Sequence, residues 1–124
     1  MNDVFDAVER LSAELSQRIG RLSQVRGWGH KPFTWMVANG DKPILLVNTT
    51  LTFPGGFYAA FTPRVEPSGN VWAIDVRRTD GVARAGWAAG LIIMKTPAGW
   101  VLSRGAGALD DDQLASMLDD LATP

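Results

Sequence analysis

The chain has 124 residues, enough for one domain and too few for two, so residues 1–124 are predicted to form a single domain. Its 46% hydrophobic and 20% charged residues are typical of a globular domain and exclude disordered, collagen-like and disulfide-scaffold classes. The chain has no cysteine, which excludes thiol catalysis, iron–sulfur clusters and cysteine-ligated zinc. It has no apolar run near the ~20 residues of a membrane helix and no basic signal-peptide start, which predicts a cytoplasmic protein without a membrane partner.

The net charge of −1 conceals a segregation of charge along the chain. Residues 1–14 and 105–124 together carry nine acids and one base, whereas residues 15–104 carry eleven bases and four acids. Acidic ends around a basic middle favour two terminal segments that dock onto a complementary sheet. A nucleic-acid-binding domain is usually clearly basic, so this balance argues against a nucleic-acid partner.

The first predicted element is a helix over residues 3–25. Six apolar residues recur at intervals of three or four, which places them on one stripe of an α-helix: Val4, Val8, Leu11, Leu15, Ile19 and Leu22. Gly27 follows the stripe and is expected to end the helix in the left-handed C′ position. Gly20 lies inside the predicted helix, where glycine costs about 1 kcal/mol of helix stability relative to alanine.

Residues from Phe33 onward alternate between short β-rich runs and turn signals, which predicts an antiparallel sheet of five or six strands. The preceding stretch Trp28–Pro32, rich in glycine and proline, is expected to be a loop. The predicted strands are Phe33–Asn39, Ile44–Phe53, Phe57–Thr62, Val71–Thr79, Leu91–Thr96 and Gly99–Arg104. The segment Val82–Gly90 stays open between helix, strand and loop, because its alanines and tryptophan permit a short helix that its two glycines oppose.

A short C-terminal helix is predicted to begin after Asp110. Asp110 with Gln113 three residues on makes a variant of the capping box, and acids in the first turn suit the helix dipole. One face of this helix is apolar through Leu114, Met117, Leu118 and Leu121. The predicted fold class is therefore α+β, with a long N-terminal helix, an antiparallel sheet and a short C-terminal helix.

Candidate catalytic groups are few. His30, the only histidine, is a candidate general base, but the sequence picks out no orienting acid or nucleophile beside it, which favours a structural loop residue. Asp110–Asp112 run consecutively into a helix, unlike the acids of a calcium loop, and are interpreted as helix-starting residues. Gly105–Ala108 lacks the third glycine of a phosphate-binding fingerprint. No catalytic residue, metal site or cofactor is predicted.

Aromatic and basic residues offer a second candidate chemistry. The chain has five tryptophans, and its densest basic group contains Arg77 and Arg78. Basic residues interleaved with aromatic ones bind single-stranded nucleic acid by stacking. Trp35, however, alternates in phase with Phe33 and Val37, which is typical of core residues. The favoured interpretation is therefore core tryptophans beside a solvated, arginine-containing strand end.

Two apolar runs predict an interaction surface. Ile44–Val47 and Leu91–Met94 are apolar at every position, a pattern typical of strands covered on both faces. The long helix is able to cover one face, but the short helix is too short for the other, so one face is expected to bind a second copy or another partner. The alternative is that Val82–Gly90 folds over this face. The predicted partner-binding residues are Trp35, Leu45, Arg77, Arg78, Ile92 and Ile93.

The last third of the chain has a layout that resembles a known family. The apolar hairpin Leu91–Arg104 leads through Ala108–Asp110 into a short acidic helix with leucines at 114, 118 and 121. With the leading helix, this layout is similar to the type III secretion chaperone-like (Tir-chaperone) superfamily. The resemblance implies a small α+β domain, often dimeric, that binds protein partners without catalysis, and some relatives are toxin-immunity or regulatory proteins. The family's central helix falls where this chain has the predicted strand Val71–Thr79, and no site residue carries over.

The sequence thus predicts a non-enzymatic protein-interaction module, a chaperone-like or immunity-like adaptor that binds a protein partner and forms a homodimer. The alternative is a small-ligand-binding protein or enzyme with a pocket between the long helix and a curved sheet. The residues predicted to line that pocket are Trp28, His30, Trp35 and Tyr58. An enclosed pocket that holds His30 beside an acid favours the alternative, whereas a flat apolar sheet face favours the interaction module.

Overall fold

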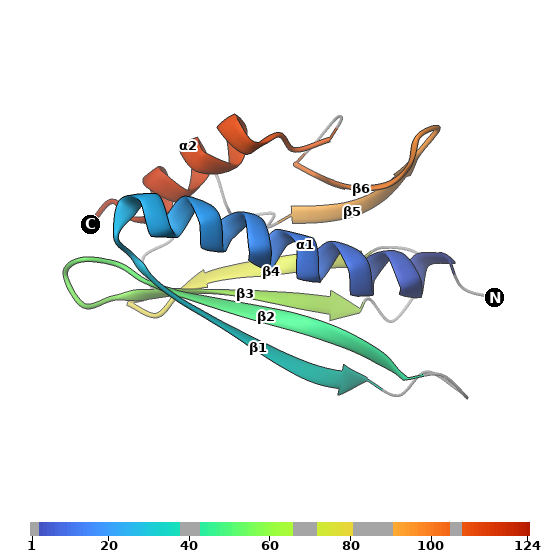
Figure 1. The fold of residues 1–124 in the computed structure, drawn as a ribbon, viewed down its shortest axis with the longest axis horizontal. Coiled ribbons are helices and arrows are strands. Elements are labelled where there is room, and N and C mark those ends of the chain that lie inside the picture. Colours follow the sequence, from blue (N-terminus) through green and yellow to red (C-terminus); the bar gives the residue numbers. More distant parts are fainter. Residues whose placement is uncertain (1–2, 38–42, 66–71, 81–90, 105–107) are drawn as a thin grey trace.

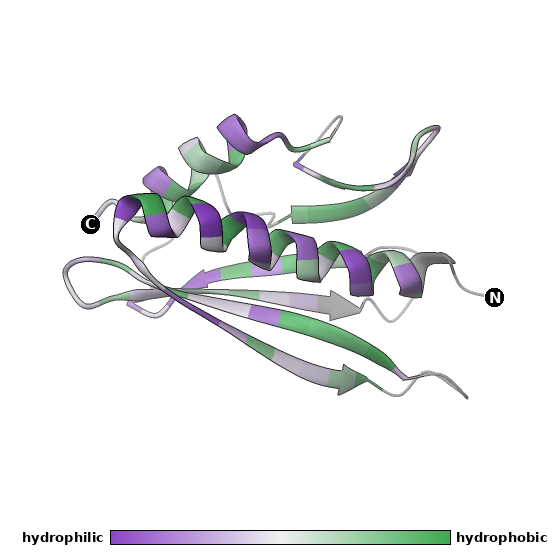
Figure 2. Ribbon diagram, in the orientation of Figure 1, coloured by the Kyte–Doolittle hydropathy of each residue, from purple (hydrophilic) through white to green (hydrophobic). Residues whose placement is uncertain are grey.

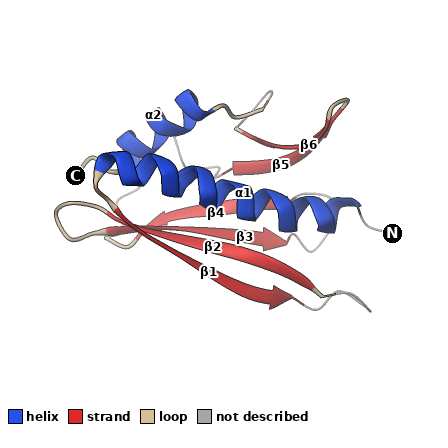
Figure 3. Cartoon of the chain, viewed as in Figure 1, coloured by secondary structure: helices blue, strands red, loops and turns tan. Residues whose placement is uncertain are grey.

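A computed structural model describes residues 3–37, 43–65, 72–80, 91–104 and 108–124. Two helices flank six strands in the order α1 (Asp3–Arg26), β1 (Gly29–Val37), β2 (Ile44–Thr52), β3 (Tyr58–Val65), β4 (Trp72–Arg78), β5 (Leu91–Thr96), β6 (Gly99–Ser103) and α2 (Asp111–Leu121). Each strand pairs antiparallel with the next, so that the sheet follows the order of the chain (Figures 1 and 3). This layout confirms the predicted α+β class, and the open segment Val82–Gly90 lies outside the described residues.

The signals at the helix ends are confirmed. Gly27 follows α1 with a φ of 74°, a left-handed conformation that glycine adopts without a steric penalty. The Asp110 side chain accepts a hydrogen bond from the Gln113 backbone, and the Gln113 side chain accepts one from the Asp110 backbone. Both boundaries are therefore fixed by residues within four positions of the helix end.

Both helices lie on the same side of strands β1–β4 (Figure 1), which we call the covered side. Hydrophobic residues alternate with polar ones along α1 (Figure 2), and the buried stripe of the helix packs on this side. The core joins α1, the sheet and α2 through Leu11, Leu15, Ile19, Leu51, Phe61, Ile74, Leu91, Leu114 and Leu118. The opposite side of β1–β4 carries neither helix, and we call it the open side.

Ion pairs hold the two helices together. Arg18 Nε lies 2.7 Å from Asp111 Oδ1, and its guanidinium also donates to the Leu109 carbonyl at 2.8 Å. Arg26 contacts both carboxylate oxygens of Asp119, at 2.6 and 3.0 Å. Basic residues of α1 thus neutralise acids of α2. The segregated charges predicted docking of the terminal segments onto a basic sheet, whereas these two ion pairs join helix to helix.

Strand β1 begins earlier than predicted. The stretch Trp28–Pro32 was expected to be a loop, which is wrong from Gly29 onward, since residues 29–32 pair with residues 49–52 of β2. Proline is tolerated because β1 is an edge strand, where a missing backbone donor costs the sheet little. Strand β3 likewise extends past the predicted Thr62 to Val65, with Pro63 beyond its last pair with β2.

The composition of the apolar run Ile44–Val47 predicts a strand that is covered on both faces. Within the described residues, one face of this run in β2 is exposed. Ile44 and Leu46 are buried, but Leu45 between them is 47% exposed. Farther along, burial moves to Thr49 and Leu51, which lie on the opposite face of the strand because side chains alternate. Two-stranded ribbons twist strongly, and the twist of β1–β2 turns a different face toward the core at each end.

Helix α1 covers the edge of β2 where this strand leaves β3. The two strands pair only over Thr49–Thr52, and beyond that point the β2 backbone turns to α1. The Leu45 amide donates to Glu9 Oε2 at 2.6 Å, and the Val47 amide donates to Ser12 Oγ at 3.2 Å. These polar helix residues replace the missing strand partner.

Candidate functional site

The open side of the sheet presents aromatic and basic side chains together. Opposed residues of an antiparallel pair share a face, so the registers place one set on this side. We call this set the open sheet face: Lys31, Phe33, Thr50, Tyr58 and Arg77. Trp35 follows Phe33 on the same face of β1, but the twist turns that face toward the core here, and Trp35 packs against the core opposite the buried Leu46. Phe33 is 64% exposed and Tyr58 is 45% exposed. Large aromatic groups are therefore in water on the sheet side that no helix covers.

Hydrogen bonds fix Trp35, next to Phe33 of the open sheet face. The indole nitrogen of Trp35 donates to Asn48 Oδ1 at 2.7 Å. The Asn48 amide nitrogen lies 3.5 Å from Thr62 Oγ1. These two hydrogen bonds link β1 through β2 to β3. The half-buried Trp35 ring is thus held in a single orientation, and less rotamer freedom is lost when a partner contacts it.

The two cations of the open sheet face stand at opposite ends of one row. Lys31 pairs with Thr50, Thr50 with Ala60, and Ala60 with Arg77. Three strand spacings of ~4.8 Å separate the two backbone positions by about 14 Å. Small side chains fill the space between, so the row forms a shallow platform with a positive charge at each end.

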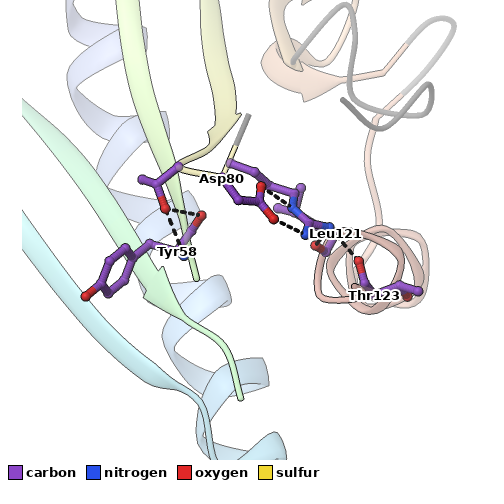
Figure 4. Close-up of polar contacts among 6 residues, drawn as sticks. Tyr58, Asp80, Leu121 and Thr123 are labelled. Carbon is purple, nitrogen blue, oxygen red and sulfur yellow. Dashed lines mark hydrogen bonds and ion pairs between the residues drawn. The ribbon is translucent and has the colours of Figure 1, made fainter. Parts of the chain in front are cut away.

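Arg78, the neighbour of Arg77, lies on the covered side and is buried. Its guanidinium makes two hydrogen bonds to Asp80, at 2.6 and 3.1 Å, and donates to the backbone carbonyls of Leu121 and Thr123 (Figure 4). It also stacks over the Phe57 ring, 4.2 Å from the centroid. Arg78 therefore anchors the end of α2 to β4. The Tyr58 ring in Figure 4 points away from this contact.

His30 lies on the covered side, between β1 and α1. Its Nε2 is 3.4 Å from Ser16 Oγ, and a Cβ at position 20 of the helix would come within 2.9 Å of the ring. Burial lowers the pKa of the imidazole, and hydrogen bonding to Ser16 opposes that shift. Gly20, which interrupts the helix pattern, is thus the residue that gives the His30 ring its space.

The structure separates the residues predicted to line a ligand pocket. His30 packs on α1, and Trp28 packs edge-on against Phe53 with ring centroids 4.9 Å apart. Trp35 packs against the core opposite Leu46, five residues along β1 from His30, and Tyr58 is exposed on the open side of β3. The four side chains are therefore not brought together at one cavity among the described residues.

The predicted partner-binding residues also divide between surface and core. Ile93 and Arg78 are buried on the covered side, because the pleat alternation turns them toward the helices. Ile92 is half-buried, whereas Leu45 and Arg77 are exposed. Trp35 was predicted to be a core residue in phase with Phe33 and Val37. Trp35 and Val37 do pack against the core, half-buried, whereas Phe33 is 64% exposed and departs from this pattern.

Sequence reasoning missed Phe33 and Met36 as surface residues. Both are large and apolar, and each is nearly two-thirds exposed. The available signal was Pro32, which marks an edge strand within a sheet. An edge strand has fewer neighbours to cover its side chains, so its apolar residues are more often exposed.

Two clefts lie away from the open sheet face. A cleft of about 400 Å³ lies between α2 and the end of β6, lined by Arg104, Leu109, Asp112, Gln113 and Met117 among others. A smaller one of about 180 Å³ lies between α1 and β6. Within the described ranges, no three His, Cys, Asp or Glu side chains gather as metal ligands. No described helix is long and apolar enough to cross a bilayer.

Comparisons with known proteins were made at three levels. No protein-family model matches the chain, and neither a curated protein nor a solved structure matches it.

Proposed function

We propose that the protein is a non-enzymatic protein-interaction module whose partner docks on the open sheet face. The observation that carries this proposal is the exposure of Phe33 and Tyr58 on the side of the sheet that neither helix covers. Aromatic residues and arginine are enriched at protein interfaces, and lysine is depleted there. Phe33 and Tyr58 would supply apolar contact area, and Lys31 and Arg77 would supply positive charge beside it.

The layout supports the same class of function. Its resemblance to the type III secretion chaperone-like superfamily favours a chaperone-like or immunity-like adaptor. The positions of the cations favour a partner with acidic side chains about 14 Å apart, around an apolar centre. A flat platform of this kind suits a protein surface, because small-molecule sites are usually concave.

The test compares three variants in one binding experiment. Purified chain is immobilised, partners from the native host are captured, and each captured partner is then purified and titrated. The double variant F33S/Y58S is expected to bind at least tenfold more weakly than wild type. V25S removes an exposed apolar residue from α1, away from the open sheet face, and is the matched control that should leave affinity unchanged.

His30→Ala provides a second control, because this residue lies on the covered side of the sheet. It should retain partner binding and biological activity. A partner that binds F33S/Y58S as tightly as wild type contradicts the proposed face. A loss of activity of more than tenfold in H30A, with the fold unchanged, contradicts the non-enzymatic function.

A further inference from the structure

Among the described residues, three of the strand edges that lack a neighbouring strand are on β2, β6 and β1, and those on β2 and β6 are covered by other parts of the chain. The free end of β2 is covered by Glu9 and Ser12 of α1. On β6, the Trp100 carbonyl accepts from Arg10 at 3.3 Å, and the Leu102 carbonyl accepts from the Leu109 amide at 2.9 Å. Both edges are thereby closed to another strand.

The outer edge of β1 is different. Among the described residues, β1 pairs with β2 on one side and with no strand on the other. Natural edge strands are usually protected by charges, proline or a bulge. Lys31 and Pro32 protect the first half of β1, but the five residues Phe33–Val37 contain neither a charge nor a proline.

Exposed apolar side chains concentrate at this same segment. Of the exposed large hydrophobic residues in the described chain, Phe33 and Met36 lie on it, and Leu45 is the register partner of Met36 on β2. Phe33 and Met36 point to opposite faces of the strand. An occupant must therefore satisfy a row of backbone groups and cover apolar side chains on both faces, which is the chemistry of another strand.

We propose that two copies of the chain join edge to edge through residues 33–37 of β1, which would give a continuous twelve-stranded antiparallel sheet. The segment Phe-Thr-Trp-Met-Val is self-complementary about its centre. With Trp35 on the two-fold axis, Phe33 faces the second copy's Val37, and Thr34 faces its Met36. These pairs oppose no like charges, and aromatic and β-branched residues meet across the strands. This register also leaves Pro32 outside the new ladder.

The dimer would extend the open sheet face without covering it. The exposed Phe33 side chains of the two copies would then lie near the centre of the joined sheet. The pairing is isologous and closes after two copies. This inference is independent of the partner proposed above, since β1 pairing is measurable on the purified chain alone.

The chain has no cysteine, so any disulfide formed in the test joins introduced cysteines. T34C and M36C are made as separate single variants, because both native side chains are exposed. Mixed under mild oxidation, T34C and M36C chains are expected to form the mixed disulfide at least tenfold faster than either forms a disulfide with itself. Opposed Cβ atoms lie about 4.5–5.5 Å apart, whereas diagonal ones are farther. V25C, at a side chain that is 83% exposed on α1, reports random collision.

Sedimentation of the untagged chain completes the test. Wild type is expected to be a dimer at tens of micromolar, and M36K, which places a charge on the edge, is expected to weaken dimerisation at least tenfold. V25K is the control, and far-UV circular dichroism confirms that all variants are folded. A wild-type monomer at 100 µM overturns the proposal. A dimer that M36K leaves intact, or cross-linking no faster than that of V25C, shows a different interface and equally overturns it.

Discussion

The covered and open sides of β1–β4 use the same residue types for different purposes. Arg78 is buried beside Asp80 and the carbonyls of α2, whereas its neighbour Arg77 is exposed. Phe61 is 1% exposed, whereas Phe33, two strands away, is in water. The difference arises from the pleat and from the placement of both helices on one side. Residue type alone therefore says little about role in this sheet, and position on a face says more.

The comparison predicts a difference in stability when each of the two arginines is replaced by methionine in turn. R78M leaves Asp80 and two backbone carbonyls without their cation. Because the Asp80 side chain is 31% exposed and is solvated by water, the expected loss of unfolding free energy is that of unsatisfied hydrogen-bond partners, about 1–3 kcal/mol. R77M should change the unfolding free energy by less than about 0.5 kcal/mol. Urea denaturation measures both values. Equal losses for the two variants would show that Arg78 does not anchor α2.

Gly20 tests the covered side at the contact between helix and strand. In wild type, G20A is expected to lower the unfolding free energy by about 1–2 kcal/mol, because its Cβ meets the His30 ring. In an H30A background the same change should raise it by up to about 1 kcal/mol, since alanine is the better helix former. A double-mutant cycle by urea denaturation measures this reversal. The same sign in both backgrounds refutes the steric role.

The pH dependence of stability sharpens the role of His30. Burial lowers its pKa in the folded state below the unfolded value of 6.5, so the unfolded chain binds a proton more readily. The stability from neutral His30 is fully present above pH 6.5 and is lost as the pH falls through the folded pKa. The slope for one proton is at most about 1.4 kcal/mol per pH unit. H30A should flatten the unfolding curve between pH 7 and 5, and identical curves contradict the prediction.

The open side should give the smallest effects. F33A is expected to change the unfolding free energy by less than about 0.5 kcal/mol, since its side chain is mostly in water. F61A on the covered side should cost about 3–5 kcal/mol. Thermal and urea unfolding measure both variants. A large loss in F33A would mean that another part of the molecule covers this aromatic side chain.

Much of the fold could be predicted because its signals are local. The capping box at Asp110, the left-handed Gly27 and the stripe of α1 each depend on residues a few positions apart. The strands from β2 onward follow turn signals of the same short range. Each strand also pairs with the next one along the chain, so the order of the strands in the sheet is the same as their order in the sequence.

The candidate site depended on contacts that no local pattern shows. Gly20 was read as a weak helix position, and only the fold brings it against His30, ten residues away. Leu45 was predicted to bind a partner and is exposed, but the twist of the β1–β2 ribbon, which decides where along β2 each face is exposed, has no local signal. Phe33 shares the alternation of Trp35 and Val37, but only the latter two pack against the core, because an alternation shows that a strand has two different faces and not how far the core extends along one of them.

The ion pairs between α1 and α2 set a timing for the folding of the molecule. Arg18 and Asp111, like Arg26 and Asp119, are 93 residues apart in the chain. At translation rates of 5–20 residues per second, roughly 5–20 s pass between synthesis of the two members of each pair. During that interval the apolar surface that later receives Leu114, Leu118 and Leu121 is unshielded on the nascent chain. The domain therefore cannot finish folding before the ribosome has synthesised α2, even if α1 forms much earlier.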